Sequence, residues 1–200
     1  ISSQRYPTPE RQSAFYDALF DSLRTTAGVQ DVGWGMFTPL AGGGWGDTFV
    51  REGTADAAPN LPAMQVKMVS PGYASALRIP LLAGRPIERT DRTGTPDVAL
   101  VNAALAARYY AGTSPVGKRI TFQKRTLEIV GVIGDIRSQS LWTPPSPELY
   151  VPIEQWGWRG GTVFLRTTAE LHSAEASVRK IVRSLDPLIP TLNVRPFDER

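Results

Sequence analysis

The last forty residues of the chain carry the pattern that most restricts its fold. Between positions 171 and 185, apolar residues recur every three or four positions opposite a charged side, which predicts an amphipathic helix. The apolar stripe consists of Leu171, Ala174, Val178, Ile181, Val182 and Leu185. Such a stripe has to be buried, and the extended segments on either side, 162–166 and 192–194, predict a sheet on which the helix packs.

The first forty residues repeat this association of a helix with a strand. Thr8 is a suitable N-cap, Pro9 suits the first helical position, and Gly28 follows the apolar repeat as a stop signal. We therefore expect a helix over about residues 9–26. Apolar residues then alternate with glycine, which predicts a strand over residues 29–37.

Together the two ends predict one subdomain that is interrupted by an inserted lobe. Elements joined by short connections usually pack together, so we expect strands 29–37, 162–167 and 191–195 to share one sheet, with both helices on the same face. The predicted division is residues 1–40 and 159–200 for the two halves of this subdomain and residues 41–158 for the lobe. A single sheet that continues from these strands into those of the lobe would argue against this arrangement.

The lobe itself combines short strands with short helices. Apolar segments predict strands at residues 64–69 and 98–101, and a hairpin over residues 120–133. Asn102 is the expected N-cap of an alanine-rich helix that ends near Gly112. The fold class is therefore α+β.

Composition excludes several classes of protein. The 22 basic and 19 acidic residues are spread along the chain without a basic cluster, so we expect no nucleic-acid partner. The absence of cysteine excludes disulfides, thiolate metal sites and a cysteine nucleophile. The longest nearly apolar stretch, Val98 to Ala107, is half the length of a membrane span of about 20 residues. Because the chain begins at Ile1 and ends on charged residues, we interpret it as a segment of a longer protein, such as a membrane protein without its spans.

Two motifs resemble catalytic or ligand sites and fail on inspection. Gly112 to Arg119 approximates a phosphate-binding loop, but Arg119 replaces the required Ser or Thr, and a strand rather than a helix follows. His172 is the only histidine, so a metal site made of several histidines cannot form, and we expect this imidazole on the surface rather than in a Ser–His relay. We expect no cofactor, no metal and no catalytic residue.

Acidic loop residues leave one enzymatic alternative open. Paired carboxylates can catalyse glycoside hydrolysis, although single loop acids more often form turns. The alternative hypothesis is therefore a small-molecule-binding or hydrolytic α/β domain. Its candidate carboxylates are Asp47, Glu52, Asp56, Asp91 and Asp135.

Three tryptophans flank a proline-rich segment in which no amphipathic pattern buries them. Trp142, Trp156 and Trp158 are candidates for contact with a partner, because exposed aromatic residues often mark an interface. The alternative is that they hold an irregular loop on the core.

Several segments in order resemble the periplasmic core of MacB-type ABC transporter permeases across about two thirds of the chain. The matching pieces are Val69 to Arg85, Ala99 to Asn102, Tyr109, Ser114 to Ile120 and Glu128 to Asp135. Arg5-Tyr6-Pro7 and Leu185-Asp186-Pro187 are similar to the long duplicated permeases of soil bacteria, of which this would be the second core.

This resemblance implies a split porter-like subdomain with an inserted second lobe, called Sabre in the family. It implies an inner-membrane protein whose periplasmic domain couples the motion of transmembrane helices to substrates or adaptor proteins outside. The partner ATPase would lie on the cytoplasmic side, and the family offers no catalytic residues for this domain. One feature departs from the family: its first porter strand precedes Arg5, and at most Ile1 to Gln4 of that strand is present.

Overall fold

The computed structural model describes the whole chain except residues 1, 3, 41–44, 56–59, 139, 141, 158–159, 191–193 and 198–200. Its strands are β1 (Val29–Gly35), β2 (Trp45–Thr48), β3 (Val50–Arg51), β4 (Ala63–Val69), β5 (Leu81–Gly84), β6 (Val98–Asn102), β7 (Arg119–Phe122), β8 (Arg125–Ile133), β9 (Glu148–Pro152) and β10 (Thr162–Thr167). Its helices are α1 (Pro9–Arg24), α2 (Tyr73–Ala76), α3 (Ala103–Tyr109), α4 (Ile153–Trp156) and α5 (Leu171–Leu185). None of the helices in the described part is long and apolar enough to cross a membrane.

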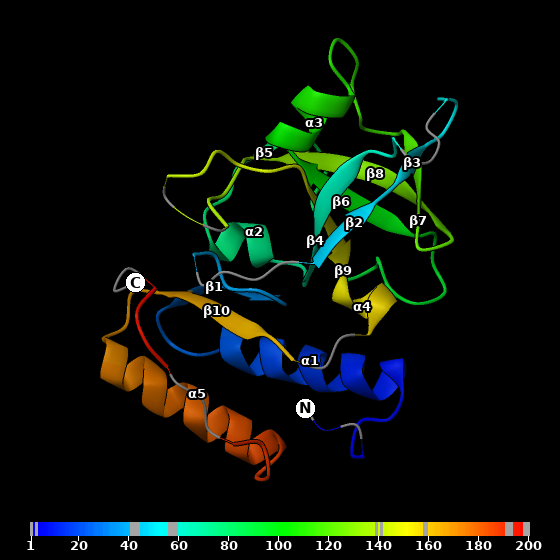
Figure 1. Cartoon of the computed structure of the whole chain (residues 1–200). Coiled ribbons are helices and arrows are strands. Elements are labelled where there is room, and N and C mark those ends of the chain that lie inside the picture. The colour runs from blue at the N-terminus through cyan, green and yellow to red at the C-terminus, as the bar shows by residue number, and fades with distance from the viewer. Residues whose placement is uncertain are drawn as a thin grey trace.

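The two ends of the chain meet as the sequence predicts. Strands β1 and β10 pair in antiparallel register, with Val32 opposite Leu165, although more than a hundred residues separate them. Helices α1 and α5 contact each other on the same side of this pair, below the strands in Figure 1. Both predictions are confirmed. The expected third strand is not seen: residues 191–193 lie outside the described part, and residues 194 and 195 are not in a strand.

The glycines of β1 make room for a helix on its other face. A Cβ at Gly33 would lie 2.5 Å from the Cα of Tyr73, and one at Gly35 would lie 2.6 Å from the Tyr73 ring. The alternating residues Val32 and Trp34 are buried in the core together with the apolar face of α1. The alternation of glycine with apolar residues therefore sets α1 on one face of β1 and α2 on the other.

The sheet does not stop at the end of β1, and here the sequence prediction is wrong. Strand β1 joins β4 at the pair Gly35 and Val69, flanked by hydrogen bonds from Met36 N–H to Met68 O and from Ser70 N–H to Trp34 O, both of 2.9 Å. The order is β10-β1-β4-β9-β6-β8-β7-β3, with β2 on β4 and β5 on β8. One mixed sheet therefore runs through both parts. The sequence did not predict this join because backbone pairing at Gly35 leaves no apolar signal.

The hydrophobic core also extends from the terminal strands β1 and β10 into the lobe. Phe164 of β10 packs edge-on against Tyr73, whose ring lies 6.1 Å from that of Tyr150 in β9. The division at residues 40 and 159 stays a prediction.

Local signals in the lobe are confirmed. The Asn102 side chain caps α3 by accepting a hydrogen bond of 3.0 Å from Leu105 N–H. Strands β7 and β8 form the predicted hairpin, whose turn residues Gln123 and Lys124 have φ values of 49° and 63°. Strands β4 and β9, and likewise β6 and β8, pair in parallel.

Candidate functional site

Three of the five loop carboxylates of the enzymatic alternative serve local structure. Asp47 accepts a hydrogen bond of 2.6 Å from Gln123, and Asp135 accepts one of 2.9 Å from Ala104 N–H at the start of α3. Asp91 is buried and binds both Nη atoms of Arg85 at 2.8 and 2.9 Å. Glu52 is exposed in the turn after β3, and Asp56 lies outside the described residues. None of these contacts joins one candidate acid to another, and the described residues contain no group of three or more acids or histidines arranged to hold a metal.

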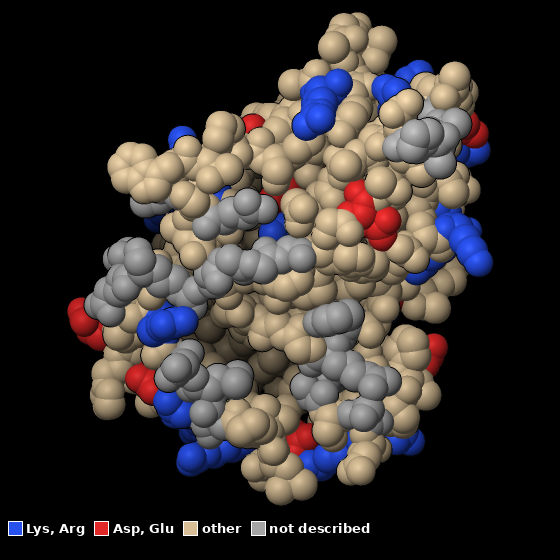
Figure 2. All heavy atoms as spheres, viewed as in Figure 1, with Lys and Arg blue, Asp and Glu red and all other residues tan. Residues whose placement is uncertain are grey.

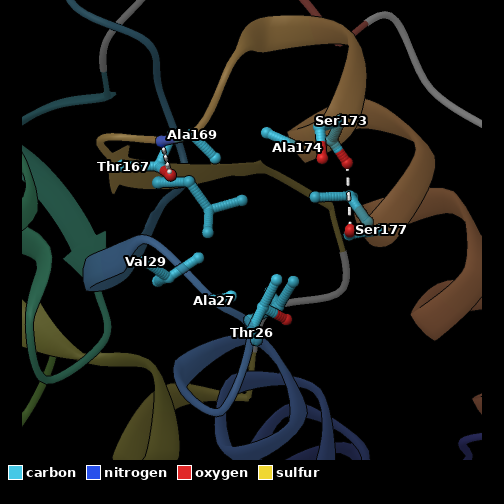
Figure 3. A pocket seen from close by; sticks show the side chains of 11 residues that line it. Thr26, Ala27, Val29, Thr167, Ala169, Ser173, Ala174 and Ser177 are labelled. Atoms are coloured by element: carbon cyan, nitrogen blue, oxygen red, sulfur yellow. Dashed lines mark hydrogen bonds between the residues drawn. The ribbon is translucent and has the colours of Figure 1, made fainter.

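The better-defined hollows are too small for a substrate. One lies between the end of α1, strand β10 and helix α5, with a volume of about 20 Å³, and Figure 3 shows that small side chains such as Ala27, Ala169 and Ser177 line it. Another, of about 10 Å³, is lined by Arg137, Ser138 and residues 143–146. Pockets for drug-sized ligands measure about 300–1,000 Å³, whereas each of these holds about one water molecule.

The loop that approximates a phosphate site is an ordinary turn into β7. Gly117 has a φ of 80°, and its N–H donates to Ile129 O at 2.8 Å instead of pointing outward. Lys118 and Arg119 are exposed, and so is His172 at the start of α5.

The three tryptophans that are candidates for contact with a partner differ in the structure. Trp142 is 91% exposed. The ring of Trp156 instead lies 5.3 Å from that of Phe122, with the Arg125 guanidinium 4.3 Å from its centre, so this residue holds α4 on the core. Trp158 lies outside the described residues. Of Trp142 and Trp156, Trp142 is the one whose side chain is exposed.

A buried carboxylate joins the two ends of the chain, and sequence reasoning missed it. Asp186, directly after α5, binds the Arg5 guanidinium and accepts hydrogen bonds of 3.0 Å from the Tyr6 hydroxyl and from Leu188 N–H. We call Arg5, Tyr6 and Asp186 the terminal clasp. Burial alone would raise the pKa of Asp186, but these hydrogen bonds and the Arg5 charge hold it below its usual value.

A second polar contact ties the lobe to α1. Arg89, in the loop between β5 and β6, binds Asp21 at 2.7 and 3.1 Å and Asp17 at 3.1 Å. Thr93 of the same loop donates a hydrogen bond of 2.8 Å to the backbone oxygen of Glu154 in α4. The Glu154 side chain is buried beside α1, its Oε2 has no hydrogen-bond partner, and burial raises its pKa to about 7.

A buried ionic cluster lies at the junction of the two parts of the sheet. Glu148 accepts hydrogen bonds from Ser138, at 2.6 Å, and from the Tyr150 hydroxyl, and Lys67 Nζ lies 3.7 Å from its Oε1. Lys67 also lies 5.3 Å from the ring centre of Phe37, in the segment that follows β1. A lysine within the apolar strand 64–69 was the sequence signal for this cluster, because a buried charge needs a partner.

Comparison with known proteins agrees with this architecture. A family model described as MacB-like periplasmic core domain matches residues 4–181. No curated protein matches the sequence.

Solved structures share the fold at low sequence identity. The periplasmic region of MacB from Actinobacillus actinomycetemcomitans has a TM-score of 0.60 at 16% identity, covering 84% of this chain and 73% of that one. The extracellular domain of the noncanonic ABC-type transporter YknZ from Gram-positive bacteria also scores 0.60, at 14% identity over 90% and 88% of the two chains. A domain of a putative permease from Porphyromonas gingivalis scores 0.51 at 15% identity, covering 83% and 69%.

Proposed function

Because the chain belongs to the MacB-like periplasmic core domain family of ABC transporter permeases, we propose that it transmits motion from the membrane to the extracytoplasmic lobe. The observation that carries this proposal is the terminal clasp, which fixes the segment before α1 to the segment after α5. In the full-length permease these segments would lead to transmembrane helices. A displacement of those helices would then move α1 and α5 as one unit.

Two connections would pass this displacement onward. The Arg89 contacts with Asp17 and Asp21 link α1 directly to the lobe. The backbone pair Gly35 and Val69 continues the sheet from β1 into β4. Since hydrogen-bonded strands resist shear, motion of β1 would be passed to β4. The parts that move would be those of the predicted domain division, residues 1–40, 41–158 and 159–200.

The receiving surface is the loop that carries Trp142. This loop follows β8 and covers the Glu148 cluster through Ser138, so its position depends on the junction of the two parts. A fully exposed indole suits contact with a substrate or an adaptor protein outside the membrane. The energy would come from a cytoplasmic ABC ATPase, which acts through the membrane part of the protein.

The test is to break the clasp and to measure how the domain responds to the nucleotide bound by the ATPase. The full-length permease and its ATPase are reconstituted in nanodiscs, and hydrogen exchange of the domain is measured with ADP and with a non-hydrolysable ATP analogue. We expect nucleotide-dependent protection in β4 and residues 134–147 that is lost in Asp186→Ala. Asp47→Asn, which alters a half-buried acid of the lobe, is the matched control. An unchanged nucleotide response in Asp186→Ala would refute the clasp as the transmitting element.

A further inference from the structure

The turn after α5 exposes one large apolar side chain at the clasp end of the domain. Leu188 is 74% exposed, whereas Ile189 beside it packs against the core. The turn holds this arrangement in place, because Leu188 N–H donates to Asp186 Oδ1 at 3.0 Å and Ile189 N–H donates to Asp186 O at 3.2 Å. The outward position of Leu188 is therefore built into the clasp.

Three basic residues lie on the segments that meet at this tip. Lys180 and Arg183 are exposed and lie three residues apart on α5, so they share one side of the helix. Arg5 contributes a guanidinium that is 45% exposed, and the nearest acid in sequence, Asp186, is buried beneath it. Several Lys and Arg side chains are visible at the lower end of the molecule in Figure 2, where α1 and α5 lie, with fewer Asp and Glu side chains between them.

We infer that this tip, Leu188 with Lys180, Arg183 and Arg5, contacts the anionic phospholipid headgroups of the membrane. An apolar side chain flanked by cations matches the boundary between acyl chains and phosphate groups. The inference rests on the proposed function, in which the clasp end faces the membrane. The contact would fix the resting position of α5 relative to the membrane.

The experiment uses the absence of cysteine in the chain. Leu188→Cys is labelled with an environment-sensitive nitrobenzoxadiazole group and mixed with vesicles of phosphatidylglycerol and phosphatidylcholine, or of phosphatidylcholine alone. We expect a rise in emission only with the anionic vesicles. Lys180→Glu with Arg183→Glu should weaken the partition by roughly fivefold or more for each charge. The matched control is Leu82→Cys on β5, which is 56% exposed in the lobe and should not respond.

Three outcomes would overturn the inference: no response at position 188, an equal response at position 82, or the same response with neutral vesicles. Circular dichroism of each variant checks that the domain is folded. The outcome is independent of the exchange experiment on Asp186→Ala, so the lipid contact and the transmission role fail separately.

Discussion

The hydroxyl of Tyr6 donates a 3.0 Å hydrogen bond to Asp186 Oδ2, across 180 positions of sequence. Tyr6→Phe removes this bond and keeps the ring that packs edge-on against Phe15. We expect a loss of about 1 kcal/mol in the free energy of unfolding, measured by urea denaturation at pH 7.

The contact between Tyr6 and Asp186 should also make the stability of the domain depend on pH. Because the folded-state pKa of Asp186 lies below its ordinary value of 3.8, its contribution to stability is complete above that value and is lost as the pH falls through the folded pKa. Asp186→Asn should therefore lose less stability than the wild type between pH 5 and pH 2. Parallel losses would show that other carboxylates dominate the acid response.

Glu154 should give the stability of the domain the opposite dependence on pH. Burial raises its pKa from 4.5 to about 7, with Asp17 and Asp91 adding to the shift and its own backbone N–H and Arg92 opposing it. A raised pKa means that the folded state prefers the protonated form, so stability is full below pH 4.5 and falls as the pH rises through 7. The loss amounts to about 3 kcal/mol. Glu154→Gln should flatten the profile of unfolding free energy between pH 5 and pH 8, and an unchanged slope would contradict the assignment.

Trp142 and Trp156 should respond differently to truncation. Trp156→Ala leaves a cavity between Phe122 and Arg125 and should cost about 3 kcal/mol. Trp142→Ala should change the unfolding free energy by no more than about 0.5 kcal/mol, because its side chain is 91% exposed. Thermal melting of both variants measures the difference, and a clear destabilisation by Trp142→Ala would assign that residue to the fold.

Features encoded by neighbouring residues could be predicted from the sequence. The helix beginning at Pro9, the Asn102 cap and the hairpin around Gln123 depend on local propensity and capping, which adjacent residues reveal. The terminal clasp and the join of β1 to β4 depend on which distant segments meet. A single pair such as Gly35 and Val69 carries no periodic signal, and neither does the partner of Asp186. The association of the two chain ends was predicted from their helix and strand patterns, whereas the join of β1 to β4 was not predicted.

Gly33 and Gly117 have different surroundings, so the cost of adding a Cβ should differ between them. Gly33→Ala places a Cβ 2.5 Å from Tyr73 Cα, and because backbone atoms cannot move aside, we expect a loss of about 2–3 kcal/mol. Gly117→Ala meets no atom within 4 Å and bears only the strain of a φ of +80°, about 1 kcal/mol. Lys118→Ala, on the same exposed turn, should be neutral within about 0.5 kcal/mol. Urea denaturation ranks the three variants, and a larger loss for Lys118→Ala than for Gly117→Ala would contradict the structural role of the turn.

The buried side chains of Lys67 and Glu148 should be energetically coupled. Burial lowers the pKa of Lys67, and the nearby Glu148 carboxylate partly offsets this effect. Lys67→Met would leave Glu148 buried with hydrogen bonds from Ser138 and Tyr150 but without its cation, at a cost of about 3 kcal/mol.

Adding Glu148→Gln removes the uncompensated charge and keeps an amide oxygen that accepts from Ser138. The double variant should therefore be at least about 1 kcal/mol more stable than the sum of the single losses predicts. Urea denaturation of the four proteins in the cycle at pH 7 measures this coupling. Since both side chains are buried, the coupling should also survive 0.5 M salt, at which exposed ion pairs are largely screened. Additive losses would show that Glu148 is held by its hydrogen bonds alone, and that Lys67 stabilises the junction only through its contact with Phe37.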